Sequence, residues 1–326
     1  MNQAFNQRRV LIVGHILDCF NDTLYGFFAV MLSSTFFDVS NYQASLLGSY
    51  GAFAAGFLAR PIGAIIMGTI GDQEGRRKPL LLSIGLIGFP TIGISLIPSF
   101  EQIGLIAPTL LICFRLCQGF LMGGEFTGVN LYNLESSTKV NLGKQAGAIA
   151  SYGALGAVLA TFLGSLVLSE GVPGWAWRLL FALGGCSSLV IYLFFKEYIK
   201  ETEDFISFRE KNDQKAISWK DTVRSNKRNI ITSCFITGLT YIPLYFSTIF
   251  GNRLFMEVGY SPSACLLLNM GQMIYIGILV NVFGRLSDKL GFKNQIILGA
   301  CVLSIVVAAC TYKSPGSHSS HKTGPQ

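Results

Sequence analysis

Two acidic residues, Asp18 and Asp22, lie inside an apolar run over residues 10–33. Together with His15 and Tyr25 they recur at spacings of three or four residues, which places all four on one face of a helix. If such a run spans a bilayer, charges within it cost free energy and usually serve a function. Two carboxylates this close cannot both ionise easily at low dielectric. One of them is therefore expected to gain and lose a proton, and structural pairing with a base from another run is the alternative.

Three further charged residues, Arg60, Arg115 and Glu125, stand in the middle of other apolar runs. We expect Arg115 either to meet one of the two acids of the first run or to hold the carboxylate of a solute. For Arg60 and Glu125, structural pairing and a part in proton coupling or solute binding are equally open alternatives.

Uncharged polar side chains in the later part of the chain are candidates for lining a polar cavity that faces the first run. Thr237, Tyr241 and Tyr245 recur at every fourth residue, and Asn269 and Gln272 lie in the run that follows. Because tyrosine stripes also occur at packing and membrane-interface positions, both interpretations stay open.

The elements that must position these residues are long apolar helices. The chain has 326 residues, of which 51% are hydrophobic and 13% charged, and its mean hydropathy is +0.48. An ordinary soluble domain is about a quarter charged, and a membrane-spanning helix needs roughly 20 apolar residues. The sequence predicts an all-α polytopic membrane protein with about nine transmembrane helices, over residues 10–33, 44–71, 78–98, 104–130, 144–169, 176–196, 228–256, 262–285 and 295–312.

Basic residues alternate between the loops of this predicted bundle. Of the 25 Lys and Arg residues, 19 fall at the N-terminus or in every second loop, which is the positive-inside asymmetry. The N-terminus and the turn around Arg76 are therefore expected in the cytoplasm, in a multi-pass protein of the cell inner membrane. The net charge of +7 is thus explained by the membrane topology, and no nucleic-acid partner is predicted.

A polar turn, GDQEGRRKP over residues 71–79, separates two apolar runs, and a weaker copy of its pattern lies between the eighth and ninth runs. Two copies in equivalent positions, six helices apart, indicate internal duplication. The pattern of the first copy begins before this stretch, at Gly68, and that of the second begins at Gly284; both glycines are expected to allow close approach of a neighbouring helix. The candidate gating residues are Gly68, Asp72, Gly75, Arg76 and Arg77 in the first turn and Gly284, Asp288, Lys289 and Gly291 in the second.

The first turn resembles the loop signature of the major facilitator superfamily, although Gln73 stands where a base is usual. The stretches LARPIGAIIMG, RLCQGFLMGGEFTG and WRLLFALGG are similar to its metabolite:proton symporter branch, which includes the proline/betaine, α-ketoglutarate, citrate and shikimate carriers. The resemblance runs from about residue 10 to 310. It implies the major facilitator fold and a secondary active transporter, which carries a small polar solute (proline/betaine or an organic acid) by proton symport and alternating access. It also implies that Asp72 and Asp288 latch the two halves together.

The resemblance favours Asp18 as the coupling acid, because the family's first helix usually reads acid, aromatic, aromatic, Asp. This chain departs from that pattern, with Asn21 at the last place and an acid one residue later at Asp22. The helical spacing does not choose between Asp18 and Asp22.

The same resemblance divides the chain into four parts: a six-helix bundle over 1–195, a cytoplasmic loop over 196–227, a partial three-helix bundle over 228–312 and a polar tail over 313–326. Because the family usually has twelve helices, nine indicate a C-terminal truncation. The alternative function is therefore a transport-inactive membrane protein that acts as a sensor or scaffold, or a pseudogene-like fragment.

Enzymatic and metal chemistry are not indicated. His15 is the only histidine before the tail, and neither H-E-x-x-H nor G-x-S-x-G occurs. The eight cysteines lie in apolar runs without a C-x-x-C pair, which is typical of small buried hydrophobic side chains. We therefore predict no cofactor and no metal. The expected partners are a small polar solute, protons and the lipid bilayer, and the sequence makes no prediction of oligomeric state.

Overall fold

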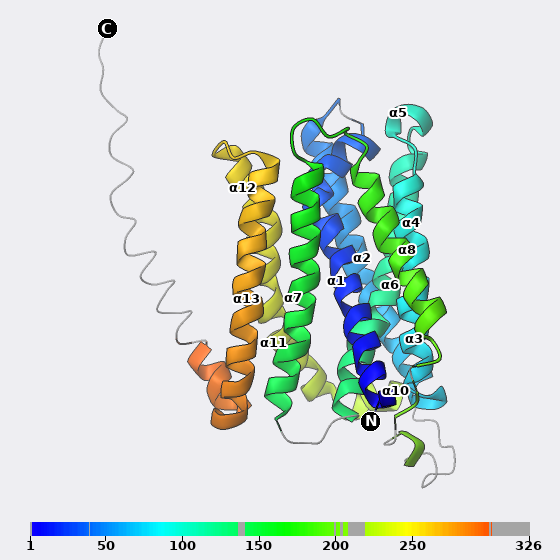
Figure 1. The fold of residues 1–326 in the computed structure, drawn as a ribbon, viewed down its shortest axis with the longest axis vertical. Helices are drawn as coiled ribbons and strands as arrows, with labels where there is room; N and C mark the ends of the chain where they lie inside the picture. The colour runs from blue at the N-terminus through cyan, green and yellow to red at the C-terminus, as the bar shows by residue number, and fades with distance from the viewer. Residues whose placement is uncertain are drawn as a thin grey trace, which may run out of the picture.

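The computed structural model describes residues 2–38, 40–135, 141–198, 200–202, 205–207, 219–299 and 301. Within these residues the regular secondary structure is entirely helical, which confirms the predicted all-α class. The elements are α1 (Asn2–Phe36), α2 (Tyr42–Glu74), α3 (Arg77–Leu86), α4 (Gly88–Leu96), α5 (Phe100–Ile103), α6 (Ile106–Glu135), α7 (Leu142–Val167), α8 (Trp177–Phe195), α10 (Trp219–Ser225), α11 (Lys227–Tyr245), the π-helical turn η1 (Phe246–Phe250), α12 (Gly251–Glu257) and α13 (Pro262–Leu290). The long helices stand side by side, with the N-terminus and α10 at one end of the bundle and α5 and α12 at the other (Figure 1).

Seven helical stretches of the described residues are long and apolar enough to cross a membrane. They are Tyr42–Glu74, Arg77–Leu96, Ile106–Tyr132, Leu142–Val167, Trp177–Phe194, Lys227–Thr248 and Pro262–Leu290. α1 is a further long helix, made more polar by the acids in its middle. The first eight predicted runs are therefore helical. The ninth, over 295–312, lies mostly outside the described residues, although 292–299 are helical.

The buried core surrounds α1, which packs against α2, α7 and α8. Its largest cluster joins Phe20, Leu24 and Phe28 of α1 to Trp177 and Phe181 of α8. The acids of α1 are therefore held in the middle of the bundle, on a helix whose other faces are fixed by aromatic and aliphatic packing.

Helix starts and breaks follow local chemistry. The Asn41 side chain accepts a hydrogen bond from the amide of Ala44 at 3.1 Å and caps α2, and Ser261 caps α13 in the same way before Pro262. Pro243 lies inside α11, and the π-helical turn η1 follows directly after the helix ends at Tyr245. Because proline lacks a backbone N–H, regular helical bonding is interrupted here, close to Tyr245.

α2 and α6 are in contact backbone to backbone. A methyl group at Gly63 would meet the carbonyl of Phe120, and one at Gly123 would meet the carbonyl of Arg60. Small residues at such crossings let membrane helices approach closely. The crossing places Arg60 of α2 directly against α6.

α7 and α13 form a second close pair, which joins the later helices to the earlier ones. The backbones of Gly143 and Gly284 touch at one end, so Gly284 makes the close approach expected for it. Midway, the Ser151 hydroxyl donates to the carbonyl of Gly277 at 2.9 Å. The expectation for Gly68 was wrong: among the described residues, a methyl group there would meet nothing within 4 Å. In α2 the close approach falls at Gly63 instead, on the face that meets α6.

The α2–α3 turn is held by charged and backbone hydrogen bonds. Asp72 pairs with Arg76 at 2.5 Å, and Gly75 adopts a φ of 108° that favours glycine. The Glu201 carboxylate accepts from the amide of Arg76 at 2.8 Å and from that of Arg77 at 3.2 Å. The start of the predicted central loop is thereby fixed against the first signature turn. Residues 208–218 of that loop and the predicted tail over 313–326 lie outside the described residues.

Candidate functional site

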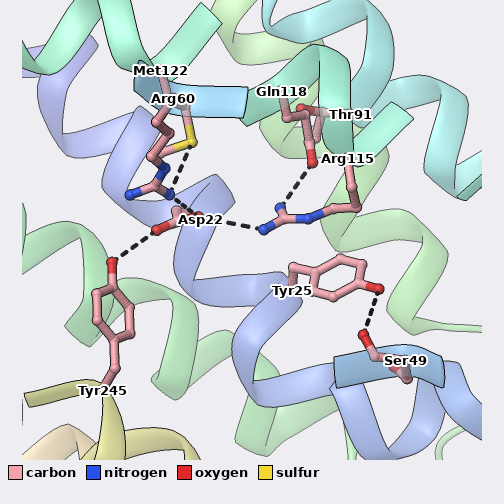
Figure 2. A network of polar contacts seen from close by, with 9 residues as sticks. All are labelled: Asp22, Tyr25, Ser49, Arg60, Thr91, Arg115, Gln118, Met122 and Tyr245. Carbon is pink, nitrogen blue, oxygen red and sulfur yellow. Dashed lines mark hydrogen bonds and ion pairs between the residues drawn. The ribbon is translucent and has the colours of Figure 1, made fainter. Parts of the chain in front are cut away.

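Asp22 is the centre of a charged network in the middle of the bundle (Figure 2). Its Oδ1 accepts a hydrogen bond from Nη2 of Arg60 at 2.7 Å and lies 3.7 Å from Nη2 of Arg115. Its Oδ2 accepts from the Tyr245 hydroxyl at 3.3 Å. Four helices, α1, α2, α6 and α11, therefore meet at one carboxylate.

The Arg115 side chain is almost fully buried. Its Nη1 donates to Oε1 of Gln118 at 2.9 Å, and Nε2 of Gln118 donates to the Thr91 hydroxyl at 2.8 Å. The guanidinium lies 4.1 Å from the centre of the Tyr25 ring, an arrangement that stabilises a cation. The Tyr25 hydroxyl donates to the carbonyl of Ser49 at 3.3 Å and so fixes the ring.

Arg60 is held differently from Arg115. Its guanidinium lies 4.0 Å from the centre of the Phe57 ring, and Nη2 also contacts the sulfur of Met122 at 3.6 Å. The exposed fraction of its side chain is 25%, against 12% for Asp22 and 2% for Arg115. Of the three side chains, Arg60 is therefore the most accessible and Arg115 the least.

Aromatic rings border the charged network. The Tyr245 ring lies 5.0 Å from Phe57 and 6.3 Å from Phe53, edge to face in both cases, and Tyr241 stacks on Tyr245 at 6.2 Å. Such edge-to-face pairs are favourable ring geometries. Of the predicted stripe, Tyr245 therefore contacts Asp22 of α1 and the rings of α2, Tyr241 stacks on Tyr245, and Thr237 is exposed.

Asp18 lies one turn before Asp22 and has a different environment. Its carboxyl group and that of Glu125 on α6 lie close enough to interact, and both residues are buried. Among the described residues no donor reaches either oxygen of Asp18 or Oε1 of Glu125. Because ionised carboxylates only accept hydrogen bonds, the two groups can bond to each other only when one of them carries a proton.

Two predicted polar residues lie apart from this network. Nδ2 of Asn269 donates to the carbonyl of Cys265 in its own helix at 3.0 Å. Nε2 of Gln272 donates to the Ser247 hydroxyl on η1 at 2.9 Å. The first bond lies within α13, and the second joins α13 to η1. Neither of these bonds involves Asp22.

The second signature turn makes a contact between α13 and α7. Asp288 accepts from the amide of Gly143 at 2.7 Å and from that of Lys144 at 2.9 Å. A carboxylate at the N-terminus of a helix satisfies free amides and complements the helix dipole. Lys289 is exposed, and Gly291 ends α13 with a φ of 81°.

Several residues of the network could not be identified from the sequence, among them Phe53, Phe57 and Thr91. Their types are common in apolar helices, so nothing in the sequence distinguishes them. Gln118 and the glycines beside it in α6 are a usable signal, because a polar residue next to a close helix crossing is expected to hydrogen-bond across it. In the described part of the chain, no three His, Cys, Asp or Glu side chains gather as a metal site would require.

Comparisons with curated proteins point to transporters. The chain is 31% identical over 304 residues to the citrate-proton symporter of Salmonella typhi, covering 90% of this chain and 68% of that protein. It is 28% identical over 317 residues to the proline/betaine transporter of Escherichia coli K12, covering 90% of this chain and 61% of that protein. The chain thus spans about two thirds of the length of these relatives.

Solved structures show the same fold. The xylose transporter XylE from E. coli, in a partially occluded inward-open conformation, matches with a TM-score of 0.63 at 18% identity, over 96% of this chain and 80% of that one. The proton:xylose symporter XylE bound to a bromodeoxyglucose matches with a TM-score of 0.66 at 16% identity, over 88% and 68%. Residues 11–321 match the Major Facilitator Superfamily, and the chain belongs to that family of membrane transporters.

Proposed function

We propose that the chain carries a small polar solute across the cell inner membrane together with protons, by alternating access. In this proposal the Asp18–Glu125 pair holds the transported proton, and Asp22 with Arg60 and Arg115 forms the site that responds to the solute. The relatives named above, a citrate-proton symporter and a proline/betaine transporter, support this class of solute.

The observation that carries the proposal is the contrast between two acids one helical turn apart. Asp22 is paired with two arginines, and these positive charges favour its ionised form over the protonated one. Asp18 has another carboxyl group beside it and no donor to either of its oxygens among the described residues. A buried acid pair that must share a proton is what a proton-coupled carrier requires.

The two networks are close enough to influence each other. Asp18 and Asp22 lie on one helix, and Glu125 and Arg115 lie on another. A second proton on the acid pair removes a negative charge from beside the arginines. Electrostatic attraction in a low-dielectric interior is strong, so proton loading favours binding of a negatively charged group.

Two polar contacts support alternating access. Asp288 holds the start of α7 against the end of α13, and Glu201 holds the α2–α3 turn. Both lie at the end of the bundle where the N-terminus lies (Figure 1), which we place in the cytoplasm from the alternation of basic loops. Breaking the Asp288 contact would let this end open.

Vesicles with a trapped pH dye test the proposal. The purified chain is reconstituted, and citrate, proline, glycine betaine and xylose are added outside in turn. We expect at least one solute to drive proton entry, Asp18→Asn to abolish that entry, and Glu101→Gln, an exposed acid in α5, to leave it unchanged. Absence of solute-linked proton movement with all four solutes would contradict symport and favour a transport-inactive membrane protein.

A further inference from the structure

We infer that the solute is an organic anion whose carboxylate binds at Arg60 and Arg115 beside Asp22. This inference rests on the proposed function, because it names the solute class of that site. It excludes neutral sugars and quaternary ammonium zwitterions as preferred solutes.

Unused donors at the centre of the network are the first support. Nε of Arg60 and Nε of Arg115 are buried, and no acceptor among the described residues reaches either of them. A buried donor without an acceptor costs free energy. Both guanidinium groups also point their Nη2 atoms at the same Oδ1 of Asp22, so two cations share one carboxylate oxygen. A second carboxylate would give these cations the paired contacts that guanidinium groups favour.

Charge balance is the second support. Two arginines and Asp22 leave one positive charge, and the Asp18–Glu125 pair cancels it while the pair shares a single proton. When the pair takes up a second proton, one positive charge remains uncompensated. The loaded site is then complementary to one negative charge, so a monoanionic carboxylate group and a proton are expected to bind together.

The faces of the aromatic rings at this site are already covered by guanidinium groups, which argues against binding of a quaternary ammonium group. Such cations bind on the faces of aromatic rings, but the face of Phe57 already carries the guanidinium of Arg60 at 4.0 Å. Arg115 likewise lies over Tyr25 at 4.1 Å and Phe53 at 5.2 Å. A third cation here would face two arginines. The edges of the same rings remain for the uncharged body of an anion.

Sugar recognition is not supported by the polar groups present. A neutral sugar needs several amide or hydroxyl partners, yet Gln118 is used by Arg115 and Thr91. Asn269 and Gln272 bond to Cys265 and Ser247, away from Asp22. The hydroxyl of Tyr245 is bonded to Asp22.

Other titratable groups surround the acid pair and bear on any pH dependence. On α1 these are His15, Cys19 and Asp22. Arg60 of α2 acts on Glu125, and Tyr241 of α11 lies near Cys19. Of these, only His15 has an ordinary pKa near neutral pH. A His15→Gln variant therefore separates its titration from that of the pair.

Equilibrium binding to the purified full chain in detergent tests the inference without requiring transport. The probes are citrate and benzoate as anions, glycine betaine as a zwitterion and xylose as a neutral sugar. We expect an anion to bind more tightly at lower pH, and Arg60→Gln to weaken it at least tenfold. Arg224→Gln, an exposed base on α10, is the matched control and is expected to have no effect. Arg115→Lys, which keeps the charge but loses the paired contacts of a guanidinium group, is also expected to weaken anion binding.

The double variant Asp18→Asn/Glu125→Gln tests whether the charge of the acid pair controls anion binding. It fixes the pair as uncharged, so anion binding is expected to persist and to lose its pH dependence, also in the His15→Gln background. Binding of betaine or xylose in place of the anions, or anion binding indifferent to Arg60→Gln, would overturn the inference. Anion binding without proton-linked flux would leave the inference standing and refute the proposed symport. Proton-linked flux of betaine would refute the inference and leave the proposed symport standing.

Discussion

The carboxyl groups of Asp18 and Glu125 are buried and close enough to interact, and neither Asp18 oxygen receives a donor from the described residues. One turn along the same helix, Asp22 is held by Arg60 at 2.7 Å. Two acids on one helical face therefore have opposite surroundings. This difference comes from the neighbouring helices, and it is the basis on which we propose that Asp18 holds the proton while Asp22 forms the ion pair.

Removing the Asp22 charge is expected to destabilise the bundle. Asp22→Asn leaves Arg60 and Arg115 facing each other without a counter-charge, and breaking one side of a buried pair costs about 3–5 kcal/mol. The midpoint of thermal unfolding in detergent should fall for Asp22→Asn and for Arg60→Gln. In the double variant, the loss of free energy of unfolding should be smaller than the sum of the losses in the two single variants. The difference, which is the coupling energy of the pair, should be roughly 0.5–3 kcal/mol.

The control for this cycle pairs Asp22→Asn with Arg224→Gln on exposed α10. Those two changes should be additive. Additivity in the Asp22–Arg60 cycle as well would show that the ion pair contributes nothing to stability.

Glycine substitutions test the α2–α6 crossing. Gly63→Ala places a methyl group against the Phe120 carbonyl, whereas the same change at Gly68 meets no described atom within 4 Å. Gly63→Ala should therefore separate the helices, destabilise the protein by about 1–3 kcal/mol and weaken solute binding through Arg60. Gly68→Ala should be neutral or stabilise by up to about 1 kcal/mol, because alanine favours helices. Equal unfolding midpoints for the two variants would contradict the close crossing.

Much of this arrangement could be predicted from the sequence, for reasons of periodicity. The spacing of Asp18 and Asp22 predicted a shared face, and the resemblance at the second signature turn implied that Asp288 joins the two halves. The choice of partner for each acid could not be predicted, because it depends on the register between α1, α2 and α6. Gly63 and Gly68 illustrate the same limit: both are glycines in one helix, and only the crossing point distinguishes them.

The contact of Asp288 with α7 gives a local prediction. Asp288→Ala removes the acceptor for the amides of Gly143 and Lys144, and loss of such a cap costs about 0.5–2 kcal/mol. Hydrogen exchange of these two amides should accelerate, while the exposed Lys289→Ala variant should leave it unchanged. Unchanged protection in Asp288→Ala would mean that the carboxylate does not hold this end.

Membrane orientation gives a further prediction. In a chain freed of its native cysteines, Glu101→Cys in α5 should react with an impermeant thiol reagent added outside intact cells. Asp221→Cys in α10, at the opposite end of the bundle (Figure 1), should react only after the membrane is opened. The reverse pattern would place the N-terminus outside and contradict the proposed topology.

Infrared spectroscopy of the carboxyl groups tests the central claim most directly, since a protonated carboxylic acid has a C=O stretch distinct from that of a carboxylate. The purified chain at neutral pH should show the band of a buried protonated carboxyl group, with slow response to deuterium exchange. That band should disappear in Asp18→Asn and in Glu125→Gln, and it should persist in Asp22→Asn, because Asp22 is paired with arginines. A wild-type chain without this band, or a band lost only in Asp22→Asn, would contradict the assignment of the proton to the Asp18–Glu125 pair.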